Sequence, residues 1–145
     1  MLGATALIFE AEDGLPCPID FGGDTAPLVY FMSFAVAERY GAQHDLARLA
    51  GLLRSQNVLN LSPLTRFGLA LPETAGDIDE LETLWQDATS LATCARAAAE
   101  AMRTTRQSHH LLDAYPGLPD RLDDLAGMAG WAAARKIRVR LTYLL

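Results

Sequence analysis

Residues 137–143 read IRVRLTY, a run in which apolar and polar side chains alternate without a break. Such alternation is typical of a β-strand that has one face buried and the other in water. Ile137, Val139 and Leu141 are therefore expected to face the core, while Arg138 and Arg140 face solvent. A lone strand leaves its backbone groups unpaired, so a second strand must lie beside it.

The best partner for this strand is the segment 5–10, TALIFE, which is rich in β-branched and aromatic side chains. Asp13 and Gly14 then mark a turn. The segment 15–21 contains two prolines, and it is at most an edge strand because proline cannot donate to a sheet. We therefore expect the two ends of the chain to pair in one small sheet.

The clearest helical pattern starts at Asp77, where apolar or small side chains recur at alternating steps of three and four. It predicts one helix of about 30 residues. Asp77 and Glu80 have the spacing of a capping box at its start. Trp85 lies on the apolar stripe and is expected to be largely buried. The stripe consists of Ile78, Leu81, Trp85, Ala88, Ala92, Ala95, Ala99 and Met102.

Alanines in the second half of this helix permit a neighbouring helix to approach closely. The predicted neighbour covers about residues 120–136, with Leu122 and Leu125 on its apolar face. Gly127 and Gly130 lie where two backbones could nearly touch, because glycine within a helix otherwise costs about 1 kcal/mol relative to alanine. The other hypothesis is that the alanine-rich helix associates with a second copy of the chain.

Two more helices are expected in the first half of the chain. The first begins near Thr25, a good N-cap, and ends near Tyr40 before Gly41. It is apolar on nearly every side, which places it in the middle of the fold. The second covers about residues 43–55 and has a leucine-rich face.

Residues 57–72 have no clear periodicity. A short helix opening at Ser62 and Pro63, and a short strand over residues 58–61, are both compatible with the sequence. With this segment left open, the sequence predicts a helix-dominated α+β fold with four to five helices and one small sheet. The length of 145 residues favours a single domain over residues 1–145.

Composition narrows the class of protein. Half of the residues are apolar and 21% are charged, which excludes wholesale disorder. No basic residue precedes the short apolar run at residues 1–10, and the longest nearly apolar stretch, 27–37, is about half of the ~20 residues that a membrane span needs. Cys17 and Cys94 fit no metal or redox spacing. We expect a cytoplasmic protein, without a membrane segment, whose two thiols are free.

Histidines are the first candidates for chemistry. His44 and Asp45 share the dipeptide of the all-helical His-Asp metal-dependent phosphohydrolases, but that site needs an earlier histidine and none precedes His44. An exposed pair at the start of a helix is the better interpretation. His109 or His110 can share a helix face with Asp113. Such a pair would still need a third ligand, from His44 or a distant carboxylate.

Acidic pairs are the second candidates. Asp77 and Glu80, and likewise Asp120 and Asp123, have the three-residue spacing of the Mg²⁺-binding acids in helical nucleotide pyrophosphohydrolases. Both pairs lie in predicted first turns, where capping and the helix dipole explain them better. We predict no catalytic residue, no bound metal and no cofactor.

The segment 22–25, Gly-Gly-Asp-Thr, precedes a helix and could hold an anion. It lacks the Lys-Ser/Thr of a P-loop, and Asp20 and Asp24 would repel phosphate. A flexible turn before the helix is the favoured interpretation.

Charge is the remaining indication of function. The net charge of -6 argues against nucleic-acid binding. Residues 1–30 carry -5 and residues 73–100 carry -6, whereas residues 31–72 carry +2 and residues 101–145 carry +3. Separated charge of this kind favours a protein partner with a basic surface.

The leading hypothesis is therefore a non-catalytic interaction protein of the immunity or inhibitor type. The alternatives are a small metal-dependent hydrolase of nucleotides or phosphoesters, which would use His109, His110, Asp113 and the acidic pairs, and a small-ligand-binding sensory domain built around the first helix.

Overall fold

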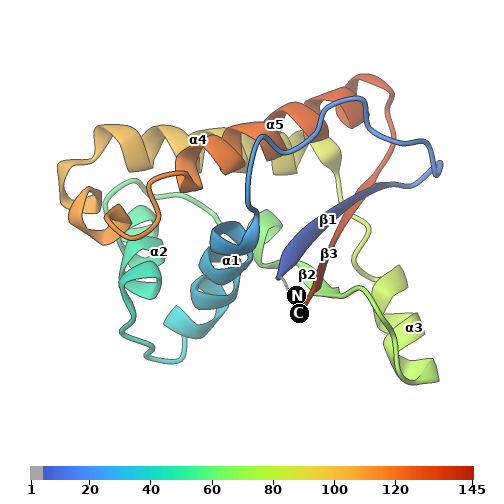
Figure 1. The fold of residues 1–145 in the computed structure, drawn as a ribbon, viewed down its shortest axis with the longest axis horizontal. Coiled ribbons are helices and arrows are strands. Elements are labelled where there is room, and N and C mark those ends of the chain that lie inside the picture. The colour runs from blue at the N-terminus through green and yellow to red at the C-terminus, as the bar shows by residue number, and fades with distance from the viewer. Residues whose placement is uncertain (1–4) are drawn as a thin grey trace.

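A computed structural model describes residues 5–145, and the fold is α+β, with helices predominating over a small sheet (Figure 1). This confirms the expected fold class. The elements in chain order are β1 (Ala6–Ala11), α1 (Ala26–Glu38), α2 (Asp45–Ser55), the 3₁₀ turn η1 (Ser62–Thr65), β2 (Phe67–Leu69), α3 (Ala75–Glu82), α4 (Ala88–Thr104), the 3₁₀ turns η2 (Arg106–Ser108) and η3 (His110–Leu112), α5 (Leu118–Ala134) and β3 (Val139–Leu144).

The sheet joins the two ends of the chain, as the sequence predicts. Its strand order is β1-β3-β2, so β3 is the central strand. β1 runs antiparallel to β3, with Leu7 opposite Tyr143 and Ala11 opposite Val139. β2 lies parallel to β3 on its other side, with Phe67 beside Leu141. This third strand was not expected, and it gives the sheet a second edge close to α3.

The other open segments are now placed. Of the two alternatives left open for residues 57–72, the short helix at Ser62 and Pro63 is present, as the 3₁₀ turn η1. The short strand considered for residues 58–61 is wrong, because Val58 has a φ of 53°, outside the extended region. No strand forms at residues 15–21 within the described part of the chain, and the segment is a loop.

One face of β3 is buried as predicted, but its other face is not open to water. Val139 and Leu141 are fully buried, and Ile137 precedes the strand and is half-buried. On the opposite face Thr142 is also buried, and the side chain of Arg140 is only 14% exposed. The expectation of a wet face is therefore wrong. Arg140 on that face lies 4.3 Å from the centre of the Trp85 ring and binds Glu10 at 2.9 Å.

The predicted 30-residue helix is also wrong, because it is interrupted between α3 and α4. Gln86 is extended there and pairs with Val139, its N–H donating at 2.8 Å and its carbonyl accepting at 3.0 Å. Asp87 then starts α4 as its N-cap, accepting from the N–H of Ser90 at 2.9 Å. A second hydrogen bond, from the Ser90 hydroxyl, is the main reason that the pKa of Asp87 lies below its usual value.

The start of α3 differs from the prediction by three residues. Its N-cap is Thr74, whose side chain accepts from the N–H of Asp77, while the Asp77 carboxylate accepts from the N–H of Thr74. The capping box is therefore Thr74 and Asp77, not Asp77 and Glu80. Trp85 lies in the segment after α3 and is half-buried, so its predicted deep burial is wrong as well.

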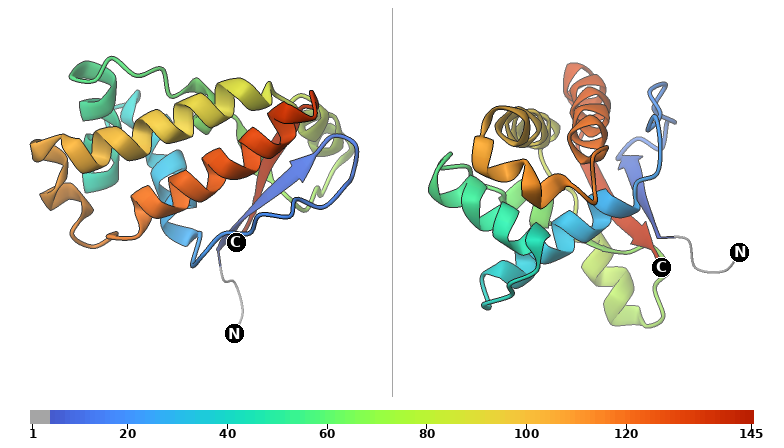
Figure 2. Two further views of the ribbon diagram at one scale, coloured as in Figure 1. Left: turned by 90° about the horizontal axis from the view of Figure 1, so that it is seen from above. Right: turned by 60° about the vertical axis from the view of Figure 1, so that its left-hand side comes forward.

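α4 and α5 pack side by side, as predicted from their small residues (Figure 2). The chain thus supplies its own neighbour for the alanine-rich helix. Arg103 of α4 ties the start of α5, with Asp120 at 2.7 Å and Asp123 at 2.6 Å. The expected role of the two glycines is wrong: a Cβ on Gly127 would meet Ile19, and one on Gly130 would meet nothing within 4 Å.

α1 contributes the largest buried side chains but is not buried on every side. Leu28, Phe31 and Met32 are fully buried, whereas Tyr30 and Val36 are exposed. Thr25 is the N-cap residue, yet its hydroxyl makes no cap and instead accepts from the N–H of Leu7 at 2.9 Å. That bond fixes the start of α1 against β1.

The end of α1 at Gly41 and the leucine-rich face of α2 both follow the prediction. Gly41, with a φ of 90°, ends the turn after α1, a conformation that glycine adopts without strain. α2 buries Leu46, Leu49 and Leu53. Among the helices of residues 5–145, none is both long and apolar enough to cross a membrane.

Candidate functional site

His44 has a structural role at the start of α2. Its Nδ1 accepts from the N–H of Leu46 at 3.1 Å, which caps the helix. Its ring stacks on Phe34 with centroids 4.1 Å apart. His44 and Asp45 are exposed, so the interpretation as an exposed pair at a helix start is confirmed.

His109, His110 and Asp113 lie on the short turns η2 and η3 and just after them, all exposed. The Nε2 atom of His109 is 3.1 Å from the carbonyl oxygen of Arg103. Over residues 5–145, no group of three or more His, Cys, Asp or Glu side chains is placed to hold a metal ion. His44 does not complete a ligand set with these histidines.

Three of the four acids in the two acidic pairs stabilise helix ends. Asp77 belongs to the capping box of α3. Asp120 and Asp123 both bind Arg103, and the hydrogen bond that the guanidinium donates to Asp123 is the largest cause of the raised pKa of Arg103. Helix-end stabilisation therefore accounts for Asp77, Asp120 and Asp123, as expected from the sequence, but not for Glu80.

The glycine-containing loop before α1 is tied to α5. The N–H of Gly22 donates to Asp124 at 2.9 Å, and Arg121 binds the same carboxylate at 2.9 Å. A side chain at Gly23 would overlap the Arg121 guanidinium, so a substitution there would require the Arg121 side chain to move. The loop amide that the sequence analysis considered for an anion is thus used by Asp124.

The two cysteines are free, as predicted. Cys94 is buried, and its thiol donates to the carbonyl oxygen of Asn60 at 3.4 Å. Burial raises its pKa to about 11, which strongly disfavours the nucleophilic thiolate at neutral pH. Cys94 also lines a pocket of about 370 Å³ together with Ser90 and Thr93. The raised pKa disfavours the Cys94 thiol as a nucleophile in that pocket.

A groove of about 340 Å³ lies between β2, the loop 71–73 and α3. Leu81, Leu84 and Tyr143 give it apolar walls. Glu73 and Glu80 place carboxylates at the same groove. An apolar groove with charged groups at its border is the usual form of a binding site.

α3 projects from the sheet, away from the other helices (Figure 1). None of its residues is buried, and Ile78 is 55% exposed. Leu69 and Leu71, on the opposite wall of the groove, are 47% and 71% exposed. Exposed apolar side chains are common singly. Leu69 and Leu71 line the groove, whereas Ile78 lies on α3 outside its lining.

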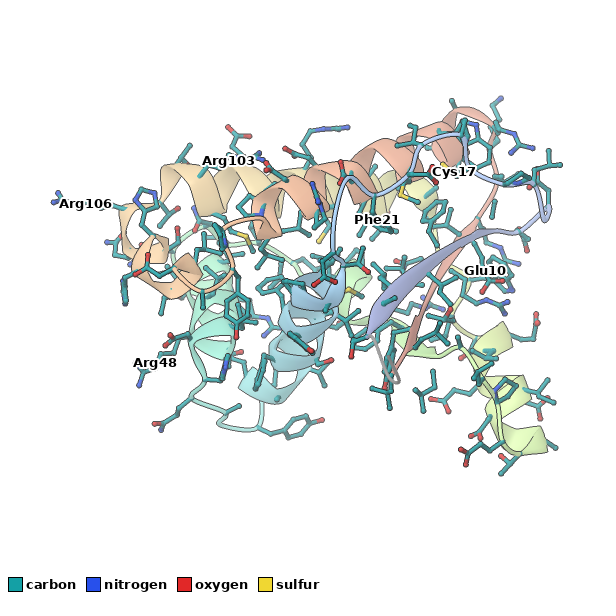
Figure 3. The ribbon with its side chains drawn as sticks, in the orientation of Figure 1. Glu10, Cys17, Phe21, Arg48, Arg103 and Arg106 are labelled. Carbon is teal, nitrogen blue, oxygen red and sulfur yellow. The ribbon has the colours of Figure 1, made fainter. Side chains whose placement is uncertain are left out.

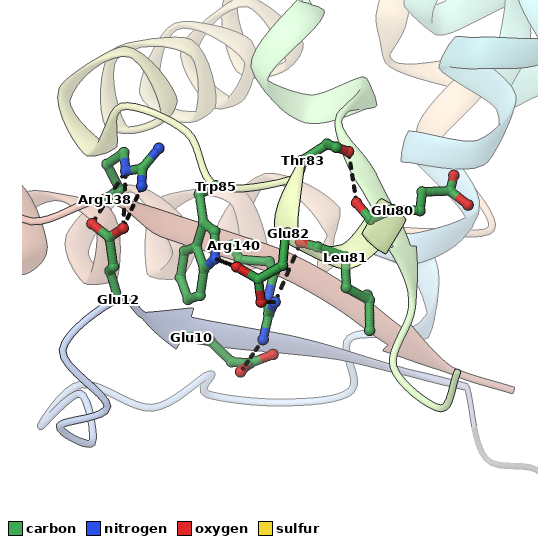
Figure 4. A network of polar contacts seen from close by, with 9 residues as sticks. All are labelled: Glu10, Glu12, Glu80, Leu81, Glu82, Thr83, Trp85, Arg138 and Arg140. Carbon is green, nitrogen blue, oxygen red and sulfur yellow. Dashed lines mark hydrogen bonds and ion pairs between the residues drawn. The ribbon is translucent and has the colours of Figure 1, made fainter. Parts of the chain in front are cut away.

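A cluster around Arg140 holds α3 to the sheet (Figure 4). The Arg140 guanidinium binds Glu10 at 2.9 Å and the carbonyl oxygen of Leu81 at 3.3 Å. It lies 4.3 Å from the centre of the Trp85 ring, and the indole N–H donates to Glu82 at 3.2 Å. Arg140 thus holds the C-terminal end of α3 through Leu81 and Glu82, and it does not contact the first turn of that helix.

The residues 70–84 contain five acids and no base, a charge of -5. Asp77 caps the helix and Glu82 contacts Trp85 and Arg140. Within the described chain, the side chains of Glu73, Asp79 and Glu80 make no hydrogen bond or ion pair. Arg48 and Arg106 lie at the other end of the molecule, far from α3 (Figure 3). Two other bases lie beside α3: Arg66 donates to the carbonyl oxygen of Thr83 at 2.6 Å, and Arg140 donates to that of Leu81 at 3.3 Å. The charge separation noted in the sequence is therefore only in part a separation in space.

Sequence reasoning identified the acidity of this region but not the groove. The groove depends on the interruption after Glu82 and on β2, and neither was predicted. The segment RFGL at residues 66–69, between two prolines, is compatible with a short strand. Asp87, with Ser90 three residues later, has the spacing of an N-cap and was the available indication that a second helix starts there.

No protein-family model, no curated protein and no solved structure matches this chain.

Proposed function

We propose that this chain is a non-catalytic interaction protein of the immunity or inhibitor type, and that it binds a basic protein partner at the groove beside α3. The observation that carries the proposal is that α3 buries none of its residues and yet forms an apolar groove with β2. Helical stability in proteins comes mostly from packing an apolar face. A partner would supply the packing that α3 lacks.

The charges select the class of partner. Glu73, Asp79 and Glu80 make no ion pair within residues 5–145, so a partner with Lys or Arg residues would supply a countercharge. Complementary charge of this kind accelerates association and excludes partners of like charge. A second copy of this chain would bring the same five acids to the interface and is disfavoured.

The proposal is tested with a photo-cross-linking amino acid placed at Ile78. The purified protein is irradiated in a lysate of the source organism at low salt and again at about 1 M salt, where screening shortens the Debye length to about 3 Å. We expect an adduct of defined mass at low salt that disappears at high salt. The same amino acid at Tyr40, which is 86% exposed and follows the end of α1, is the matched control.

An adduct that forms at Ile78 and not at Tyr40, and that is lost at high salt, supports the proposal. The proposal fails if Ile78 gives no adduct, if both positions give the same adducts, or if the adduct persists at high salt. Replacing Ile78 leaves the core intact, because that side chain is exposed.

A further inference from the structure

The outer edge of β2 is unpaired. The N–H of Ala70 donates to the carbonyl oxygen of Tyr143 at 2.9 Å, so Ala70 faces β3. In a strand, successive residues point their backbone groups to alternate sides, which places Gly68 toward β3 and directs Phe67 and Leu69 outward. Among residues 5–145, no hydrogen bond joins the N–H or C=O groups of Phe67 and Leu69 to any other segment on that side.

This edge opens into the groove. Phe67, Gly68 and Leu69 all line it, and α3 stands across from them. Native sheets usually cover a free edge, or defend it with charge, because it is a template for another strand. Here the acids of α3 and the loop 71–73 surround the edge without pairing with its backbone groups.

We propose that the partner enters this groove as an extended basic segment that adds to β2 as a fourth strand. This inference rests on the proposed function and specifies how the partner is recognised. The N–H and C=O groups of Phe67 and Leu69 would pair with the main chain of the segment. Main-chain pairing of this kind supplies affinity, and side chains on alternate positions supply specificity.

The residues that line the groove indicate which amino acids the partner's segment should contain. Apolar side chains on one face would meet Leu81 and Leu84, while Lys or Arg side chains on the other would reach Glu73 and Glu80. The sequence expected is therefore one in which apolar and basic residues alternate. The same acids repel the free edge of another copy of this chain, so they defend β2 against self-pairing while leaving it open to a basic strand.

The test measures amide exchange with solvent by NMR, residue by residue, on the full chain with and without the peptide acetyl-Lys-Val-Lys-Val-Lys-Val-amide. Strand addition should slow exchange at Phe67 and Leu69 by about tenfold or more at saturating peptide. Gly68 and Ala70 already face β3 and serve as internal controls that should change little. The acidic peptide of the same length, with Glu in place of Lys, should leave all four unchanged.

Each outcome is decisive. Slower exchange confined to Phe67 and Leu69, with the basic peptide alone, supports strand addition. Shifted resonances in α3 without slower exchange at these two amides would show binding in another form, which overturns the inference and leaves the proposed function standing. No response to the basic peptide, or an equal response to the acidic one, also overturns the inference. The cross-linking at Ile78 decides the proposed function separately.

Discussion

Deletion of residues 137–145 should abolish cooperative folding. The deletion removes β3, which is the central strand and the pairing partner of both β1 and β2. It also removes Val139 and Leu141, both fully buried, each worth about 1.5–3 kcal/mol of apolar burial. With Gln86 and two strands left unpaired as well, the loss is of the order of the whole stability of a domain, about 5–15 kcal/mol.

The measurement is thermal unfolding followed by circular dichroism in the near and far ultraviolet. The truncated chain is expected to lose its near-ultraviolet signal and its sigmoidal transition. Deletion of Leu145 alone, which is 70% exposed, is the control and should leave the transition in place. A truncated chain that unfolds cooperatively at the Tm of the intact protein would show that β3 is peripheral.

Replacement of Arg140 by alanine should release α3 from the sheet. Arg140 is the one side chain that joins Glu10, the Leu81 carbonyl, Glu82 and Trp85, and it is only 14% exposed. Hydrogen bonds to a charged group and a half-buried cation–π contact together are worth about 2 kcal/mol. We expect the free energy of unfolding to fall by about that amount, and the amides of α3 to exchange faster than those of α4.

Arg138→Ala is the matched control for this variant. Arg138 precedes Arg140 by two residues and pairs with Glu12, and its side chain is 57% exposed. Exposed ion pairs contribute little to stability because solvent screens them. Chemical denaturation and hydrogen exchange should therefore separate the two variants. Equal effects of the two replacements, or unchanged exchange in α3 after removal of Arg140, would contradict the role assigned to Arg140.

The sheet was predictable where local pattern determines burial. The alternation over residues 137–143 identified a strand, and the two termini pair because no other segment offers a comparable partner. β2 was not predictable in this way. It is three residues long, and it is a strand because β3 offers it a parallel edge, which is a long-range condition that periodicity does not contain.

The interruption between α3 and α4 has a similar origin. The apolar stripe continues through Trp85, so the periodicity alone predicts one helix. Pairing of Gln86 with Val139 and capping by Asp87 compete with the helix at that point and prevail. The residues of the apolar stripe therefore do not all pack on one neighbour. Those in α4 pack on α5, whereas Leu81 in α3 lines the groove.

For the candidate site, the sequence led to the prediction of a basic partner but did not indicate the surface. The acids at residues 73–82 were visible, and capping was expected to explain them. Capping explains Asp77, while Glu73, Asp79 and Glu80 lie free of side-chain contacts in the described chain. Their position beside an unpaired strand edge became apparent only when β2 and the interruption were known.

The most direct measurement compares two triple charge reversals in their association with the partner recovered through Ile78. Glu73→Lys, Asp79→Lys and Glu80→Lys form the groove set, which changes two acids that line the groove and a third, Asp79, on α3. Asp20→Lys, Glu100→Lys and Asp113→Lys change exposed acids elsewhere, and each set brings the net charge from -6 to 0. The account predicts that the groove set slows association by about 100-fold at low salt, while the control set stays within about threefold of the intact protein. Equal slowing by both sets would show that net charge alone attracts the partner, and it would contradict a binding site at α3.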